Sequence, residues 1–212
     1  MTLPFASVED VVFDAADALR VPVLVAALAA LAFVVWEVGA LCVEMARRRR
    51  RDQATLERTA IAARGAVAAG DPQRAGVVLL GAASSTAMEQ AFTRVVGFLG
   101  HPGAEQRIAK SLADFDLSSM RRLERTRLLV RAGPALGLMG TLIPLSPALS
   151  GLARGDVQEL TDNLRVAFSI TVLGLLVGAV AFGISLVRDR LYAQDFSDLE
   201  FVAAVLTEEP QP

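Results

Sequence analysis

The sequence has very little of what most metal sites and catalytic clusters are built from. Its 212 residues include one cysteine, Cys42, and one histidine, His101. A single cysteine excludes an intramolecular disulfide, and a single histidine excludes a His–Cys zinc site and a His-based catalytic cluster. The net charge of −2 gives no basic footprint, so nucleic acid is not an expected partner. Neither a metal nor an organic cofactor is expected.

Aromatic residues are also scarce, at 6%, whereas hydrophobic residues make up 53% of the chain and the mean hydropathy is +0.46. This hydropathy is well above that of a soluble globular protein. Because the apolar residues are mostly Ala, Val and Leu, the composition favours close packing of helices. Three apolar stretches, 21–45, 128–152 and 164–187, are each long enough to cross a hydrocarbon core of roughly 30 Å. The sequence therefore predicts an all-α integral membrane protein with three transmembrane helices, the last two joined as a hairpin by the polar loop 153–163.

The distribution of arginine predicts the orientation of these helices. Residues 1–20 and the loop 153–163 are net acidic, so both are predicted to be external. Arginines gather in the run Arg47–Arg51, just before the second span and just after the third span. Residues 46–127 and 188–212 are therefore predicted to be cytoplasmic. Because the positive run follows a long apolar stretch, the first span is interpreted as a retained anchor rather than a signal peptide. The run is also expected to contact anionic lipid head groups.

The segment 46–127 is predicted to be a domain of helices, with breaks where turn residues cluster at 70–72 and 100–103. Its most apolar part, 76–100, is interrupted by charged residues, so its uninterrupted part is too short for a fourth span. The domain offers no nucleophile with a base, no phosphate loop and no ligand cluster, so an enzyme is not expected.

Residues 188–212 are predicted to form a C-terminal helix and tail. The apolar residues of this helix recur at spacings of three and four, which places them on one face. These residues are Tyr192, Phe196, Leu199, Ala203 and Leu206.

Small residues follow one face of each hairpin helix at the same spacings. In the second span they are Gly137, Thr141, Pro144, Ala148 and Gly151. In the third span they are Ala167, Thr171, Gly174, Gly178, Ala181 and Ser185. Interfaces between helices in lipid use small residues because these let the backbones approach. The two faces are therefore predicted to be packing seams, each with one threonine inside the membrane.

The two threonines allow two interpretations. If the hydroxyls of Thr141 and Thr171 face each other, they can line a water-filled pathway or bind a cation. Alternatively, each hydroxyl can simply donate to a carbonyl of its own helix. Glu37, well inside the first span, is likewise either a functional intramembrane acid or a structural residue that bonds a neighbouring helix. Glu44, at the inner end of that span, is interpreted as solvated.

Two motifs of the hairpin resemble the MotA/TolQ/ExbB proton-channel family. The run Pro134-Ala135-Leu136-Gly137-Leu138-Met139-Gly140-Thr141 is similar to the P-x-L-G-L-x-G-T segment of the family. Ala167 to Leu175 is similar to its A-x-x-x-T-x-x-G-L segment. Both motifs occur in order and in the matching spans, and the three-span, N-out topology is that of the ExbB and TolQ branch.

The resemblance implies a homopentamer in the cell inner membrane that surrounds the single transmembrane helices of an ExbD-, TolR- or MotB-like partner. In the family the partner carries an aspartate, and ion flow past it is converted into mechanical work or transport, as in a stator. Thr141 and Thr171 take the positions of pore-facing threonines of the ion pathway. The alternative is a non-conducting three-span scaffold or accessory subunit of a transport complex. The sequence leaves proton and sodium, and the cargo, undecided.

One position departs from the family pattern. The transport branch often has a glutamate five residues before the third-span threonine, where this sequence has Val166. This difference favours a mechanism in which the partner's aspartate is the only titrating group.

Overall fold

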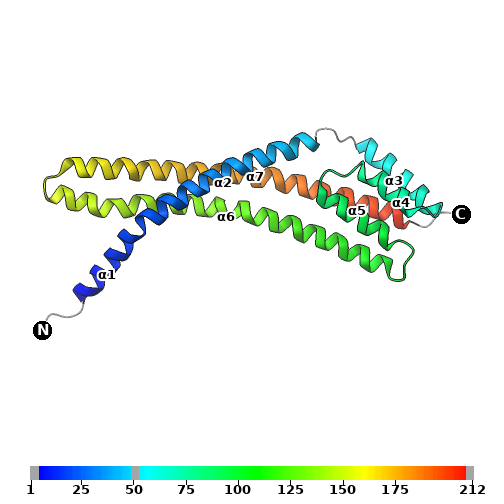
Figure 1. Ribbon diagram of the computed structural model, residues 1–212, viewed down its shortest axis with the longest axis horizontal. Coiled ribbons are helices and arrows are strands. Elements are labelled where there is room, and N and C mark those ends of the chain that lie inside the picture. Colours follow the sequence, from blue (N-terminus) through cyan, green and yellow to red (C-terminus); the bar gives the residue numbers. More distant parts are fainter. Residues whose placement is uncertain (1–4, 49–52, 209–212) are drawn as a thin grey trace. The chain divides into compact units, whose positions relative to one another are not determined.

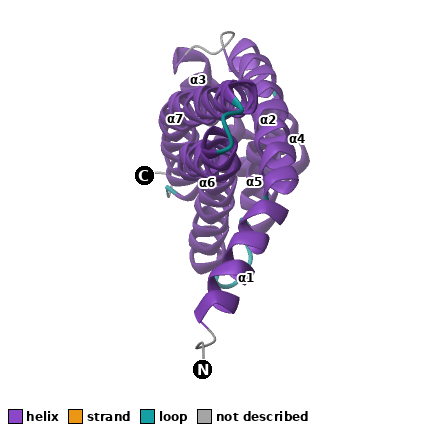
Figure 2. Ribbon diagram, turned by 90° about the vertical axis from the view of Figure 1, so that its left-hand side faces the viewer, coloured by secondary structure: helices purple, strands orange, loops and turns teal. Residues whose placement is uncertain are grey.

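The computed structural model describes residues 5–48 and 53–208, and every regular element within these ranges is a helix (Figures 1 and 2). The helices are α1 (Phe5–Ala18), α2 (Arg20–Arg48), α3 (Gln53–Ala68), α4 (Pro72–Leu80), α5 (Thr86–Phe98), α6 (Ala104–Ala153) and α7 (Val157–Thr207). Residues 1–4, 49–52 and 209–212 lie outside the described residues, and these include Arg49 to Arg51 of the arginine run.

Three helical segments are long and apolar enough to cross a membrane: Val11–Arg48, Ala104–Ala153 and Val157–Thr207. The predicted fold class, all-helical with three candidate spans, is therefore confirmed. The stretch 76–100 is divided between α4 and α5, of 9 and 13 residues, and neither approaches the roughly 20 residues that a span needs. Ser85 begins α5 as its N-cap, because its hydroxyl accepts a hydrogen bond from the Met88 amide.

The helices are longer than the predicted spans. α1 occupies most of the segment 1–20 and is separated from α2 only by Leu19. The second span and the residues before it form the 50-residue α6, and the third span and the C-terminal residues form the 51-residue α7. At 1.5 Å per residue each of these two helices is roughly 75 Å long. The predicted breaks near 70–72 and 100–103 do occur, at Gly70 and Gly100, which have φ values of +77° and +76°.

The chain divides into two compact units. We call Met1–Gly39 with Arg125–Ser185 the hairpin unit, and Ala40–Glu124 with Leu186–Pro212 the helical-domain unit. In the hairpin unit, α6 and α7 run side by side from a tight turn at 154–156 (Figure 1). One face of α2 is buried there at spacings of four and three, with Ala30 and Val34 packed against Val177 and Ala181 of α7.

The helical-domain unit has a larger apolar core. α3, α4, α5 and the ends of α6 and α7 contribute to it, and Leu79, Met88 and Phe92 are fully buried. Leu199, Ala203 and Leu206 of α7 also belong to this core, as the spacing of the C-terminal apolar residues predicts. The core therefore joins the C-terminal part of α7 to the three short helices.

Candidate functional site

The hairpin helices are in backbone contact at four glycines, Gly133 and Gly137 of α6 and Gly174 and Gly178 of α7. A Cβ atom on Gly174 would lie 2.5 Å from the Gly133 carbonyl oxygen and 2.8 Å from the Gly137 Cα. A Cβ atom on Gly133 would lie 2.7 Å from the Gly174 carbonyl oxygen. No real side chain fits at these distances, so the absence of side chains is what allows the two helices to approach this closely.

Thr171 sits at this crossing and bonds both helices. Its half-buried hydroxyl lies 3.2 Å from the Gly137 carbonyl oxygen of α6 and 3.2 Å from the Ala167 carbonyl oxygen of α7. A threonine hydroxyl has one proton to donate and two lone pairs that accept. Since the proton is directed at backbone carbonyls, what Thr171 can still offer a ligand is an acceptor.

Thr141 is bonded within its own helix. Its hydroxyl donates to the Leu138 carbonyl oxygen at 2.7 Å, the local pattern that the sequence left open as an alternative. In the part of the chain that the structure describes, the hydroxyls of Thr141 and Thr171 do not bond each other. Like Thr171, Thr141 presents only lone pairs to a further partner.

The buried face of α6 differs from the predicted seam in the middle of the span. Gly137 and Pro144 are buried, but between them Gly140 is buried against Ile170 of α7, while Thr141 is only half-buried. A helix of 3.6 residues per turn allows a step of either three or four, so spacing could not separate these neighbours. On α7 the predicted seam residues Gly174, Gly178 and Ala181 are all buried.

Gly133 also belongs to the α6–α7 contact, although the predicted seam did not include it. It stands four residues before Gly137, so the two glycines form a small-x-x-x-small pair, which is a known signal of close helix approach. The partner pair on α7, Gly174 and Gly178, has the same spacing. The two pairs therefore face each other across the hairpin.

Glu37 lies on the buried face of α2, at a relative exposure of 8%. It continues the spacing of Ala30 and Val34, which pack against α7 within the hairpin unit. Glu37 also has an interaction partner. Glu37 is therefore directed into the protein rather than outward from this unit.

A buried ionic cluster in the helical-domain unit was not predicted. Arg48 of α2 donates two hydrogen bonds to the Asp195 carboxylate of α7, at 2.9 and 2.6 Å, and a third to the Leu191 carbonyl at 2.9 Å. The Ser84 hydroxyl donates to the same carboxylate at 2.7 Å. The side chains of Arg48 and Asp195 are only 8% and 2% exposed.

The cluster corrects two expectations about the end of the first span. Arg48 was expected to contact lipid head groups, but its guanidinium is buried, and its two terminal nitrogens donate to Asp195 and Leu191 inside the protein. Glu44 was interpreted as solvated, but its carboxylate bonds Arg48 at 3.0 Å and lies 3.6 Å from Nε of Arg188. Burial, and to a smaller extent the charge of Glu44, raises the pKa of the neighbouring Tyr192.

A signal for this cluster was present in the sequence. Asp195 stands on the predicted apolar face of the C-terminal helix, three residues after Tyr192 and four before Leu199. A carboxylate on a buried face requires a cationic partner. Within residues 5–48 and 53–208, no three His, Cys, Asp or Glu side chains are grouped to hold a metal ion.

The three long apolar helices and the tightly packed hairpin define a multi-pass membrane protein. The model of the MotA/TolQ/ExbB proton channel family matches residues 85–198, which is more than half of the chain. The protein therefore belongs to this family. The matched region contains α5, α6 and most of α7, and so includes both threonines and the four glycines. No curated protein sequence gives a significant match to the chain.

Proposed function

We propose that the protein is an ion-channel subunit of the cell inner membrane that forms a homopentamer around the single transmembrane helix of a partner. The ion is a proton, and its flow past an aspartate of the partner is converted into mechanical work or transport across the envelope. Membership of the proton channel family supports the channel class of this proposal.

The observation that carries the proposal is the state of the Thr171 hydroxyl. Its proton is directed at the Gly137 and Ala167 carbonyl oxygens, so it presents lone pairs to a ligand. A protonated aspartic acid can donate to those lone pairs, whereas an ionised carboxylate has no proton to donate. The site therefore binds the neutral form of a partner's carboxyl group in preference to the charged form, which is the discrimination that a proton cycle needs.

The surface of the hairpin supports an assembly around a partner helix. Leu138, Leu142 and Leu149 of α6 are each more than half exposed, as are Phe168, Val172 and Leu175 of α7. Such large apolar faces are stable only against lipid, other copies or a partner helix. With Val166 at the position described above, the seam of α7 offers no acid of its own, so a titrating group has to come from the partner.

The test is proton flux in liposomes that contain the chain with or without a co-expressed single-span partner. We expect flux only with the partner, and loss of that flux in Thr171→Val, because valine keeps the shape but removes the lone pairs. Thr171→Ser is the matched control, because it keeps the hydroxyl and should conduct.

The scaffold alternative rests on the absence of a bond from Thr141 to another helix, since its hydroxyl donates only to Leu138 of α6 among the described residues, whereas Thr171 also bonds across the hairpin. If Thr171→Val and Thr141→Val complexes both assemble and both conduct at the wild-type rate, the threonines are packing residues. The protein would then be a non-conducting scaffold or accessory subunit.

A further inference from the structure

A cleft of about 470 Å³ lies in the helical-domain unit, between the end of α2 and the start of α5. From α2 it is bordered by Val43, Ala46 and Arg47, which share a helix face because they are three and four residues apart. From α5 it is bordered by Thr86 and Glu89, which are also three residues apart. Its size is within the range of about 300–1,000 Å³ that is typical of ligand sites. Because both apolar and charged side chains border the cleft, its ligand should have both kinds of surface.

Two opposite charges border the cleft, one from each helix. Arg47 is exposed and Glu89 is half-buried. Among the residues that the structure describes, these two side chains do not form an ion pair with each other. A ligand with a single charge would be attracted by one of them and repelled by the other. The pair therefore favours a ligand that carries both a negative and a positive group.

Two serines before α5 border the same cleft, and their hydroxyls offer different things to a ligand. The Ser84 hydroxyl donates to the Asp195 carboxylate at 2.7 Å, so it presents lone pairs that accept. The Ser85 hydroxyl accepts from the Met88 amide at 3.3 Å, so it still has a proton to donate. The cleft therefore combines an acceptor for a group with N–H donors and a donor for an anion.

The cleft lies where the first span changes from apolar to charged. The apolar stretch 21–45 ends two residues before Arg47, and Val43, inside this stretch, is 56% exposed. The end of an apolar span lies at the level of the lipid head groups, and an arginine there extends into the head-group layer. A membrane lipid can therefore contact Val43 with its acyl chains and Arg47 with its head group.

We propose that this cleft binds the head group of phosphatidylethanolamine. Arg47 and the Ser85 hydroxyl donate to the phosphate. Glu89 and the Ser84 hydroxyl accept hydrogen bonds from the primary ammonium group, and the acyl chains lie along Val43. A choline head group has no N–H donor for Glu89, and a glycerol head group has no positive charge. The cleft therefore distinguishes between lipids, whereas the arginine run by itself predicted only a contact with anionic head groups.

The test is native mass spectrometry of the full chain in detergent micelles, titrated with phospholipids that share the same acyl chains. We expect phosphatidylethanolamine to bind about tenfold more tightly than phosphatidylcholine or phosphatidylglycerol, because neither of these can make the charged hydrogen bonds to Glu89. Equal binding of the three lipids, or tighter binding of phosphatidylglycerol, would overturn the proposal. The measurement needs neither a partner nor ion flux, so its outcome is independent of the proposed function.

Two variants that each remove one charge locate the site. Glu89→Gln should abolish the preference for phosphatidylethanolamine over phosphatidylglycerol, and Arg47→Gln should weaken the binding of phosphatidylethanolamine about tenfold. Glu105→Gln and Arg94→Gln are the matched controls, because these exposed residues carry the same charges but do not border the cleft. Circular dichroism and elution volume report whether each variant is folded. If folded Glu89→Gln and Arg47→Gln bind phosphatidylethanolamine as the wild type does, the lipid lies elsewhere and the proposal is wrong.

Glycerophosphoethanolamine, the same head group without acyl chains, separates a membrane lipid from a soluble ligand. Because it has no apolar part to lie along Val43, it should displace the lipid only at much higher concentrations. Displacement at the same concentration as the lipid itself would show that the cleft takes a soluble compound, and would overturn its assignment to a membrane lipid.

Discussion

The two units of the molecule bury opposite kinds of residue. The helical-domain unit buries large side chains such as Phe92, Leu79 and Met88, as a soluble domain does. The hairpin unit buries glycine and alanine at the α6–α7 contact, while large residues such as Phe168 and Val172 are 64% exposed. In water, apolar area removed from solvent stabilises a fold. In lipid that driving force between helices is absent, and close backbone contact replaces it.

The polar contacts differ in the same way. The hairpin unit joins α6 and α7 through a neutral hydroxyl-to-carbonyl bond at Thr171, where no charge has to be buried. The helical-domain unit joins α2 and α7 through the charged pair Arg48–Asp195. A buried charge is costly when its partner is removed, whereas a neutral bond is cheap to lose. These two contacts should therefore respond very differently to the loss of a single polar group.

The largest effect is expected for Asp195→Ala in the helical-domain unit. This change removes the carboxylate that accepts two hydrogen bonds from the buried Arg48 guanidinium. Because Glu44 remains as a second acidic partner, the cost should lie at the lower end of the about 3–5 kcal/mol typical of breaking a buried ion pair. The measurement is the free energy of unfolding in mixed micelles. Asp114→Ala is the matched control, because Asp114 pairs with Lys110 at the surface and exposed pairs contribute about 0–1 kcal/mol.

The double variant Arg48→Met with Asp195→Leu sharpens this comparison. Replacing a whole buried pair with apolar residues is often neutral, so the double variant should recover most of the lost stability. Equal stabilities of Asp195→Ala and Asp114→Ala would contradict the assignment of a costly buried charge.

A smaller effect is expected for Gly174→Ala in the hairpin unit. The added methyl would meet the Gly133 carbonyl oxygen at 2.5 Å, so the helices must separate, at a cost of about 1–3 kcal/mol. Gly183→Ala, on the same helix, is the control, because a Cβ atom there has no neighbour within 4 Å. Alanine favours a helix over glycine, so Gly183→Ala should leave stability unchanged or raise it. A similar loss in both variants would show that close approach is not what holds the hairpin.

The helices and candidate spans could be predicted because their signals are local. Apolar length defined the three spans, and the turn residues around Gly70 and Gly100 defined two of the breaks. The Arg48–Asp195 pair could not be predicted in this way, since its members are 147 residues apart and no periodicity connects them. Only the placement of Asp195 on an apolar face pointed to a buried partner.

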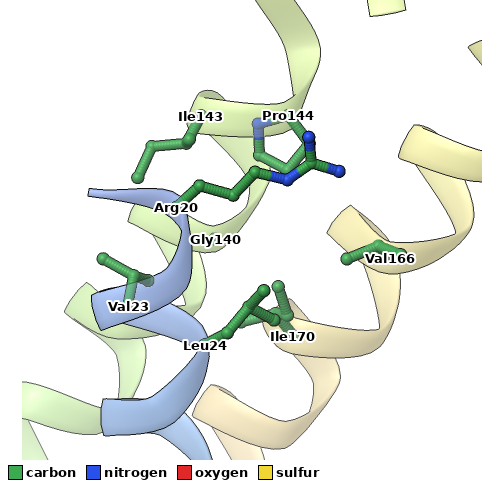
Figure 3. Close-up of a pocket in the computed structure, with 8 residues that line it drawn as sticks. All are labelled: Arg20, Val23, Leu24, Gly140, Ile143, Pro144, Val166 and Ile170. Atoms are coloured by element: carbon green, nitrogen blue, oxygen red, sulfur yellow. The ribbon is translucent and has the colours of Figure 1, made fainter. Parts of the chain in front are cut away.

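The residues of the α6–α7 contact were predictable only in part, and the ion pathway at Thr141 and Thr171 stays a prediction. The spacing rule identified Gly137, Gly174 and Gly178, which do lie at the helix crossing. It could not choose between Gly140 and Thr141, because adjacent residues differ by only 100° around a helix and both fit a step of three or four. The small cavity that Arg20 borders (Figure 3) could not be predicted from the sequence, because it depends on α2, α6 and α7 meeting.

The smallest effect on stability, and the sharpest test of the hairpin, is expected for the two threonines. Thr171→Val removes a bond between α7 and the Gly137 carbonyl of α6, and bonds of this kind between membrane helices average about 0.6 kcal/mol. Thr141→Val removes only the bond to Leu138 within α6, so it should be nearly neutral in the same unfolding assay. If Thr141→Val destabilises the protein as much as Thr171→Val does, the Thr141 hydroxyl must have a partner outside its own helix. Because Thr141 is half-exposed within the chain, that partner would belong to a second copy or to the enclosed helix, and repeating the measurement over a range of protein concentrations would reveal a second copy.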